Sequence, residues 1–463
     1  MLELSGRNLL EQFRTRSLSP LEYAKALISH ISKWEPALGA LYLYKPDQYL
    51  ANAKQSEDRW QRGEPIGPLD GLPVTVKELI ATKGDPVPQG SAASPLIPAT
   101  ADAPIAARLK EAGAIIFAKT TVPDFGMLSS GLSTFHTLAR NPWNLSCNPG
   151  GSSAGASAAA AAGYGPLHVG TDIGGSVRLP AAWCGIVGFK PSLGRIPVDP
   201  YYIGRCAGPM TRNVGDAALM MPTLSEPDSR DATSLPRNNI NWESWYRGYN
   251  LKGLKIGLML EPGCGLPLED EIRAAVENAA RKFAALGAEI IPVAPVMTQE
   301  MLSGLDDFWS VRSWAELRKL PEQDQEKVLP YIWEWASRGK NIDAIQAVDG
   351  LGQTFAMRRA CAALFDTVDV VLSPTTPNVS FPAEYPGPTN DPHRPFDHIV
   401  YTVPWNMSEQ PAISLNCGFS KDGMPIGLQI VTPRFADLEA LQLGSIWETL
   451  AGPVTNWPTP PSH

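Results

Sequence analysis

The chain has no apolar run long enough to cross a bilayer as a helix. None of its 463 residues lies in a stretch that approaches the ~20 consecutive apolar positions that a membrane-spanning helix needs. The first fifteen residues carry charges throughout and contain no apolar core of a secretion signal. We therefore expect a cytoplasmic protein without a membrane partner.

Cysteine and histidine are scarce, with six of each in the chain. The cysteines are at least twenty-two residues apart, so there is no CxxC pair and no spacing typical of a zinc site. A disulfide framework is not expected in a chain of this length, and free buried thiols are predicted instead. The six residues are Cys147, Cys184, Cys206, Cys264, Cys361 and Cys417.

Positive charge is also limited, because 39 Lys and Arg stand against 47 Asp and Glu, giving a formal net charge of −8. Nucleic acid held through a general basic surface is therefore not expected. The length is sufficient to bury a substantial core, either in one large α/β domain or in two to three smaller ones.

Apolar spacing and turn residues predict helices that alternate with strands. Helices are expected within residues 1–62, near 104–112, over 269–286, and in the alanine run 154–163, whose small apolar surface on all sides indicates close packing. Short β-rich runs predict strands at 73–76, 114–119, 167–172, 254–260, 288–294 and 368–377. A polar linker is expected at 225–244. We predict an α/β fold in which helices cover a central mixed, twisted sheet.

One serine directly follows two glycines in GTDIGGSVRLP, residues 170–180. Gly174 and Gly175 can adopt dihedral angles that are closed to other residues, so successive N–H groups can converge on one oxyanion. Such a donor typically raises a rate by ~10²–10³. The simplest alternative is a turn serine, but the paired glycines favour Ser176 as a nucleophile.

A nucleophilic hydroxyl needs a base, and no histidine lies within seven residues of Ser176. One candidate base is Lys77, at the end of an apolar run. It can accept a proton near pH 7 only if burial lowers its pKa from ~10.4 to about 7. The alternative interpretation of Lys77 is a solvated surface lysine.

A second pattern, G-x-S-x-G at 151–155, offers a histidine-based alternative. It would make Ser153 the nucleophile of an α/β-hydrolase, with His393 or His398 as the base. A nucleophile of that kind follows a buried strand, whereas this one follows a loop rich in proline and asparagine. The pattern is therefore the weaker of the two.

Several longer motifs together resemble the amidase signature family of serine hydrolases. In chain order they are GPLDGLPVTVKE, NPGGSSAGASAAAAAG, GTDIGGSVRLPAAWCGIVGFKPSLGRIP, GPMTRNVGDAALMM and YTVPWNMSEQPAISLNCGFSKDGMPIGLQIV. The likeness covers residues 60–220 and 365–435, and the segment between them matches only in pattern. It implies a single domain, 1–463. Its parts would be N-terminal helices (1–62), a signature core (63–220), a divergent substrate-pocket segment (225–395) and a C-terminal part of the core (396–463).

The resemblance implies a Ser-Ser-Lys triad. Ser176 would be the acylated nucleophile, Ser152 would relay its proton and follow a cis peptide bond, and Lys77 would be the neutral base. The oxyanion would be held by the backbone amides of Ile173, Gly174, Gly175 and Ser176. The supporting residues would be Asp172, Arg178 and Ser153, with Asp172 and Arg178 holding the loop through hydrogen bonds. No metal or organic cofactor is implied.

The chain departs from the family pattern at a few positions. Ile173 and Glu78 replace a common threonine and aspartate. Glu409 stands where glycine is usual, facing either the substrate region or solvent. Ile399 and Leu179 replace an aspartate and a glutamine that are typical of the amidase-like subunits of tRNA-dependent amidotransferases.

We therefore expect an amidase that hydrolyses a linear, small-molecule carboxamide to an acid and ammonia or an amine. The two apolar replacements favour it over the alternative, the amidase-like (A) subunit of a glutamine-dependent amidotransferase, which would need a partner chain and tRNA. A homodimer is compatible with the family. Four tryptophans of the divergent segment either pack in the core or form an aromatic wall for a hydrophobic amide: Trp309, Trp314, Trp333 and Trp335.

Overall fold

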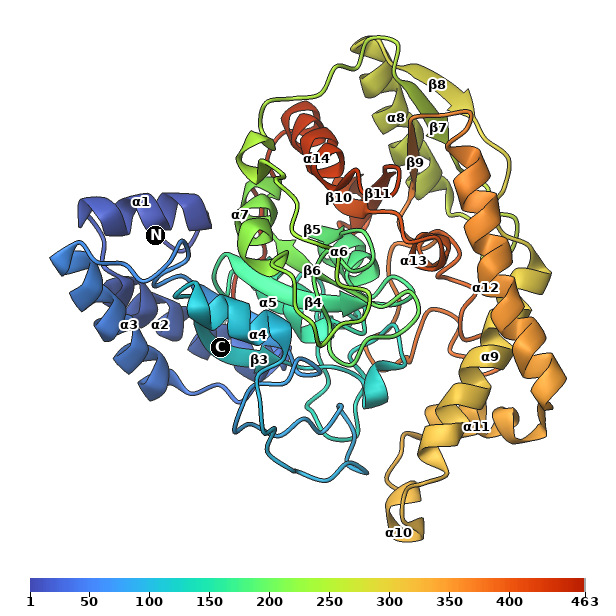
Figure 1. Cartoon of the computed structure of the whole chain (residues 1–463), viewed down its shortest axis with the longest axis horizontal. Coiled ribbons are helices and arrows are strands. Elements are labelled where there is room, and N and C mark those ends of the chain that lie inside the picture. The colour runs from blue at the N-terminus through green and yellow to red at the C-terminus, as the bar shows by residue number, and fades with distance from the viewer. Residues whose placement is uncertain (462–463) are drawn as a thin grey trace.

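The computed structural model describes residues 1–461, and within them eleven strands form one sheet in the order β1-β3-β2-β4-β6-β5-β10-β11-β9-β7-β8 (Figure 1). The strands are β1 Leu41–Tyr42, β2 Pro73–Lys77, β3 Ile115–Thr120, β4 Leu167–Asp172, β5 Val187–Lys190, β6 Cys206–Thr211, β7 Lys255–Leu258, β8 Glu289–Pro292, β9 Val370–Pro374, β10 Ala412–Phe419 and β11 Pro425–Val431.

The sheet is mixed. Strand β2 pairs in parallel with β3 and β4, and β7 pairs in parallel with β8 and β9. The strands between these two groups, from β4 through β9, pair antiparallel. This arrangement confirms the predicted α/β fold with a central mixed sheet.

Helices surround the sheet. The α-helices of residues 1–461 are α1 Gly6–Thr15, α2 Pro20–Leu38, α3 Pro46–Arg62, α4 Pro104–Glu111, α5 Ala154–Ala162, α6 Arg178–Cys184, α7 Val214–Leu224, α8 Asp270–Ala285, α9 Gln299–Leu317, α10 Glu322–Gln325, α11 Pro330–Ser337, α12 Ala344–Leu364, α13 Val403–Met407 and α14 Asp437–Ala451. Each predicted strand and helix is present within a few residues of its expected bounds. None of these helices is both long enough and apolar enough to cross a membrane.

The N-terminal region departs from its predicted all-helical structure. Helix α2 ends at Gly39, whose φ of +60° turns the chain sharply, and the next residues form the two-residue strand β1 on the edge of β3. The cysteine prediction holds only in part: all six thiols are free, but Cys147, Cys264 and Cys417 are only half-buried.

Helix α5 packs on the sheet, where it contacts β2, β3, β4 and β6, and all of its residues are buried. Its alanines belong to two apolar clusters. One is the large cluster that also includes α4, α7, α8 and α14, and the other contains α6 and Met210 of β6. The alanine-rich helix is therefore packed on several sides, as its composition predicted.

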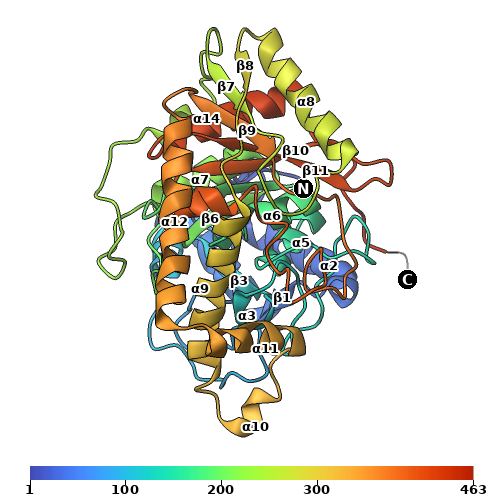
Figure 2. The ribbon, with the colours of Figure 1, turned by 90° about the vertical axis from the view of Figure 1, so that its right-hand side faces the viewer.

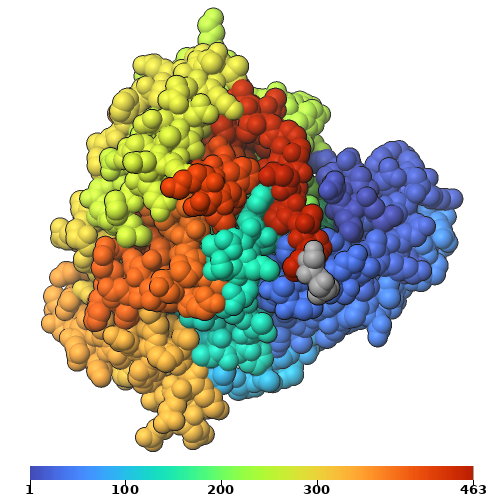
Figure 3. Space-filling view, turned by 180° about the vertical axis from the view of Figure 1, so that it is seen from behind, coloured from blue at the N-terminus to red at the C-terminus, as the bar shows by residue number. Residues whose placement is uncertain are grey.

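Helices α9, α11 and α12 of the divergent segment lie beside the sheet, whereas β7, β8 and β9 of the same segment belong to it. Helices α9 and α12 pack against each other (Figure 2), and α12 also contacts α13. On the opposite side of the molecule, the surface of the last fifty residues adjoins that of the N-terminal helices (Figure 3). Residues 396–461, called the closing segment below, supply β10 and β11 of the sheet and the helices α13 and α14.

Gly155 lets α5 approach the edge of the sheet. A methyl group placed on it would lie 2.2 Å from the Ala40 carbonyl oxygen and 2.5 Å from the Thr121 amide nitrogen, and neither backbone atom can move away freely. We predict that Gly155→Ala lowers the free energy of unfolding by ~2 kcal/mol or more. Gly352→Ala is the control, since Gly352 lies within α12 with open space around it. It should be neutral or stabilise by ~1 kcal/mol. Urea denaturation of both variants measures the difference, and equal effects would contradict the packing argument.

Candidate active site

Lys77 ends strand β2. The alternation of the strand directs Thr75 and Lys77 to the face opposite Val74 and Val76, and there Lys77 meets Ser152, just before α5. The Lys77 side chain is fully buried. Its Nζ donates to Ser152 Oγ at 2.8 Å and to the Thr171 carbonyl oxygen at 3.4 Å.

The surroundings of Lys77 favour its neutral form. Burial is the main cause, and the positive charge of Arg205 adds to it, while Asp172 and Glu78 act in the opposite direction. The net result lowers the pKa of Lys77 to about 7. A substantial fraction of the amine is therefore unprotonated at neutral pH.

Ser152 and Ser153 lie just before α5, and a cis peptide bond joins Gly151 to Ser152. Their hydroxyls have different partners. Ser152 accepts from Lys77, whereas Ser153 Oγ donates to the Thr171 carbonyl oxygen at 3.2 Å and accepts from the Thr171 N–H at 3.3 Å. Ser153 is thus hydrogen-bonded to the backbone of β4.

The two histidines of the α/β-hydrolase alternative do not reach Ser153. His393 is exposed and lies 3.6 Å from Glu334, while Ser153 is fully buried. Neither ring nitrogen of His398 has a hydrogen-bond partner within residues 1–461, and burial lowers the pKa of His398 to about 3. The geometry gives no support to a histidine base for Ser153.

Ser176 lies in the loop between β4 and α6 and is 9% exposed. Strand β4, which leads into this loop, is parallel to β2. Lys77 at the end of β2 and Ser176 just after β4 therefore lie at the same edge of the sheet. Across residues 1–461, no hydrogen bond joins the Ser176 hydroxyl to Ser152. Of the three triad residues, the structure therefore links Lys77 and Ser152 directly and places Ser176 in the adjoining loop.

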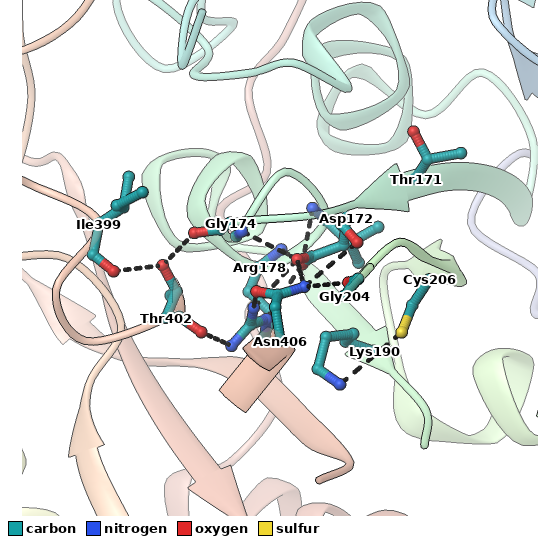
Figure 4. Close-up of polar contacts among 12 residues, drawn as sticks. Thr171, Asp172, Gly174, Arg178, Lys190, Gly204, Cys206, Ile399, Thr402 and Asn406 are labelled. Carbon is teal, nitrogen blue, oxygen red and sulfur yellow. Dashed lines mark hydrogen bonds and ion pairs between the residues drawn. The ribbon is translucent and has the colours of Figure 1, made fainter. Parts of the chain in front are cut away.

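A buried ion pair holds this loop (Figure 4). Asp172 accepts from the N–H groups of Gly175 at 2.8 Å and Val177 at 3.1 Å, and its carboxylate is bound by Arg178 through Nε and Nη2, each at 3.0 Å. Burial alone would raise the pKa of Asp172, but Arg178, Lys190 and Asn406 outweigh that effect and lower it to about 2. The carboxylate is ionised at neutral pH.

All five N–H donors of Arg178 are used within the protein. Besides Asp172, they reach the Thr402 carbonyl oxygen, the Gln429 side chain and Asn406 Oδ1, at 3.0, 2.8 and 2.6 Å. Arg178 is fully buried. It holds the loop in place and has no donor left for a substrate.

The backbone N–H groups of the nucleophile loop, between β4 and α6, differ in whether they have a hydrogen-bond acceptor. The Gly175 N–H donates to Asp172 Oδ1, although the resemblance assigned it to the oxyanion hole. For the amides of Ile173, Gly174 and Ser176, no acceptor is found among the described residues. These three N–H groups are available to an oxyanion.

Several residues of the closing segment take part in ways that the sequence did not indicate. Thr402 Oγ1 donates to the Gly174 carbonyl oxygen at 2.6 Å, and Asn406 Nδ2 donates to Asp172 Oδ1 at 2.8 Å and to the Gly204 carbonyl oxygen at 3.0 Å (Figure 4). Their motif was part of the family resemblance, but a single sequence does not show which loop a motif contacts.

Glu78 and Glu409 both have partners inside the protein. Glu78 accepts from the N–H groups of Gln89 and Gly90, at 3.1 and 2.6 Å, and lies 3.2 Å from His136 Nε2. Glu409 pairs with Arg358 and with Arg434, the latter at 2.6 Å. Glu409 was expected to face either the substrate region or solvent. Instead, its carboxylate is held between two arginines of the protein.

The four tryptophans separate into distinct contacts. Trp314 and Trp333 pack edge to face on each other, and Trp335 does so on Phe396. Trp309 reaches the nucleophile loop, since a methyl group placed on Gly174 would lie 3.3 Å from its ring.

A small cavity adjoins this cluster. It is lined by Met127, Leu128, Ser129, Tyr331, Trp335, Pro386, Pro395 and Phe396. Gly126, just before this lining, is close to Ser152: a methyl group placed on it would lie 3.6 Å from Ser152 Oγ. A wider cavity between α3 and β3 has none of the triad residues in its lining.

Comparison with known proteins identifies the family. The amidase family model matches residues 22–441, and the chain belongs to the amidase signature family of amide-hydrolysing enzymes. An acylamidase of Rhodococcus erythropolis is 31% identical over 96% of this chain and 95% of its own length. The amidase-like (A) subunit of the glutamyl-tRNA(Gln) amidotransferase of Geobacter metallireducens is also 31% identical, over 97% of both chains.

Solved structures agree. A bacterial aryl acylamidase of the amidase signature family superposes with a TM-score of 0.89 and 27% identity, over 97% of this chain and 96% of its own. A 6-aminohexanoate cyclic dimer hydrolase gives a TM-score of 0.86 and 25% identity over 99% of both chains. The likeness therefore extends through the divergent segment.

The Asp172–Arg178 pair predicts a large effect on stability. Asp172→Asn would leave the fully buried Arg178 without its counter-ion, so we expect the free energy of unfolding to fall by ~3–5 kcal/mol. Glu64→Gln, which removes an exposed pair with Arg62, should cost at most ~1 kcal/mol. Thermal and urea unfolding of the two variants provide the comparison. A loss below ~1 kcal/mol for Asp172→Asn would show that the pair does not hold the loop.

Proposed function

We propose that this enzyme hydrolyses small-molecule carboxamides through an acyl-enzyme on Ser176, with Ser152 as the proton relay and Lys77 as the base. The observation that carries the proposal is the 2.8 Å hydrogen bond between the buried Lys77 Nζ and Ser152 Oγ. Because the pKa of Lys77 is lowered to about 7, this amine can accept a proton under neutral conditions.

Acylation begins when Ser176 Oγ attacks the amide carbon. Its proton passes to Ser152 Oγ, while the proton of Ser152 passes to Lys77 Nζ. The tetrahedral intermediate then collapses: the C–N bond breaks, and the nitrogen takes a proton from Ser152, which is replenished by Lys77. In the second half of the reaction, water attacks the acyl carbon and gives its proton to Ser152, whose own proton passes to Lys77. The relay then returns a proton to Ser176 Oγ as the ester bond breaks, which releases the acid.

The oxyanion of each intermediate would be bound by the available loop amides of Ile173, Gly174 and Ser176. Each well-placed donor contributes ~10²–10³ in rate. The Gly175 N–H instead fixes the loop through Asp172, which keeps the other amides oriented before the substrate arrives. Thr402 adds to this order by holding the Gly174 carbonyl group.

The names of two similar proteins support an acyl amide as the substrate. One relative is named an acylamidase, and one structural neighbour is named an aryl acylamidase. We propose an acyl amide with a hydrophobic arm. The small cavity lined by Trp335 and Phe396 has room for about one water molecule, so it does not hold this arm.

A role as the amidase-like component of a tRNA-dependent amidotransferase is the second candidate, because curated relatives with that name match nearly the whole chain. The apolar Ile399 and Leu179 argue against it. Both are buried, and neither can bind the polar groups of glutamine. If the chain were such a component, hydrolysis of the amide would require a second polypeptide and glutamine.

Replacing the nucleophile provides the first test. Ser176→Ala should lower kcat for a simple anilide by roughly 10⁴–10⁶-fold, because no other hydroxyl can form the acyl-enzyme. It should also abolish labelling by a serine-directed fluorophosphonate. Ser153→Ala is the matched variant and should retain the label. Labelling that follows Ser153 instead of Ser176 would refute the assignment.

The proposed role of Lys77 as the base predicts how kcat/KM depends on pH. Since only neutral Lys77 accepts a proton, kcat/KM should rise about tenfold per pH unit below a midpoint near 7 and level off above it. Stopped assays between pH 5 and 9 give the midpoint. A profile that is flat across pH 7 would mean that Lys77 is not the base.

A further inference from the structure

Two arginines beside the proposed active site lack a counter-ion. Neither Arg205 nor Arg312 has a carboxylate within ion-pair distance among residues 1–461. The Arg205 side chain donates from Nη1 to the Pro200 carbonyl oxygen at 2.9 Å, and this hydrogen bond does not neutralise its charge. The fully buried Arg178, by contrast, is paired with Asp172.

Strand pairing places Arg205 next to the nucleophile loop. Asp172, the last residue of β4, pairs with Cys206, the first residue of β6, so Ile173 and Arg205 directly flank the paired ends of the two strands. The residue before it, Gly204, is tied to the same place by the hydrogen bond from Asn406 (Figure 4). Arg205 is partly buried there, and its charge is one of the causes that lower the pKa of Lys77.

Helix α9 brings Arg312 to the same place. Arg312 follows Trp309 by three positions, so the two side chains lie on one side of the helix. The Trp309 ring faces the nucleophile loop, because a methyl group placed on Gly174 would lie 3.3 Å from it. The Arg312 guanidinium lies 3.8 Å from the ring centroid of Tyr202, three residues before Arg205. Burial lowers the pKa of Arg205, and the positive charge of Arg312 lowers it further, so the two guanidinium groups repel each other.

This concentration of positive charge is incomplete without an anion. Burial of Arg205 costs free energy that no carboxylate of the described chain returns, and Asp199, whose charge acts on Arg205, is exposed and outside ion-pair distance. A guanidinium is the group best suited to bind a carboxylate through two parallel hydrogen bonds. An oxyanion that arrives with a ligand would supply such a partner.

We propose that Arg205 and Arg312 bind a carboxylate carried by the substrate, so that the enzyme prefers amides with a carboxylate near the scissile bond to neutral amides. The inference rests on the proposed amidase function and names the substrate class of the same site. The carboxylate would lie between β6 and α9, close to the loop that binds the oxyanion.

A matched set of anilides tests the proposal. Acetanilide is neutral, 4-acetamidobenzoate carries a carboxylate on the amine arm, and N-phenylsuccinamate carries one on the acyl arm. The wild-type enzyme should prefer at least one of the acids to acetanilide by about tenfold or more in kcat/KM. Arg205→Met and Arg312→Met should each reduce that ratio at least about fivefold, the size expected from losing a charge-assisted hydrogen bond.

Arg318→Met serves as the control, because Arg318 is an exposed arginine at the end of the same helix. It should leave the ratio unchanged. A wild-type ratio near one for both acids would overturn the proposal, as would a preference that both arginine variants retain. Arg312 is exposed, so its variant remains informative even if Arg205→Met fails to fold.

Binding to inactive enzyme separates the two proposals. Calorimetric titration of Ser176→Ala with the preferred acid should show saturable binding that the additional change Arg312→Met weakens at least about fivefold. Binding that is insensitive to Arg312 overturns the carboxylate site alone. Full anilide hydrolysis by Ser176→Ala would instead overturn the proposed function, while the titration would still report on the arginines.

Discussion

The buried ion pair between Asp172 and Arg178 organises the rest of the site. Taking both charges out of water is costly, and such a pair is retained only where further hydrogen bonds satisfy the remaining donors and acceptors. Here Arg178 also binds groups from α13, from β11 and from the turn before α13. One side chain thus joins the nucleophile loop to segments that follow it by more than two hundred residues.

The proposed base depends on a different constraint, which is close packing. Burial lowers the pKa of Lys77 to about 7, and α5, which packs on β2, is one of the elements that bury it. Alanine and glycine make that approach feasible, since larger side chains would hold α5 away from β3. The same helix begins just after Ser152, so the packing that buries the amine also sets the position of its hydrogen-bond partner.

The sequence was most informative where structure is local. Periodicity and turn residues predicted β2, β4 and α5 because each of these elements contains its own apolar pattern. The resemblance then named Lys77, Ser152 and Ser176. The short strand β1 was missed because its two residues extend only by pairing with β3. The partners of Glu409 were missed for a related reason: Arg358 and Arg434 come from opposite sides of it in the chain, and only the fold brings them together.

Charge balance around Lys77 connects the base to the proposed substrate. Arg205 lowers the pKa of Lys77, whereas Asp172 and Glu78 raise it. A carboxylate bound to Arg205 would offset the first effect, because its negative charge stabilises a nearby ammonium group. The amine would then bind the proton from Ser152 more strongly, but a smaller fraction of it would be neutral at pH 7. An anionic substrate would therefore make Lys77 a stronger base and raise the pH at which that base is available, whereas a neutral amide would do neither.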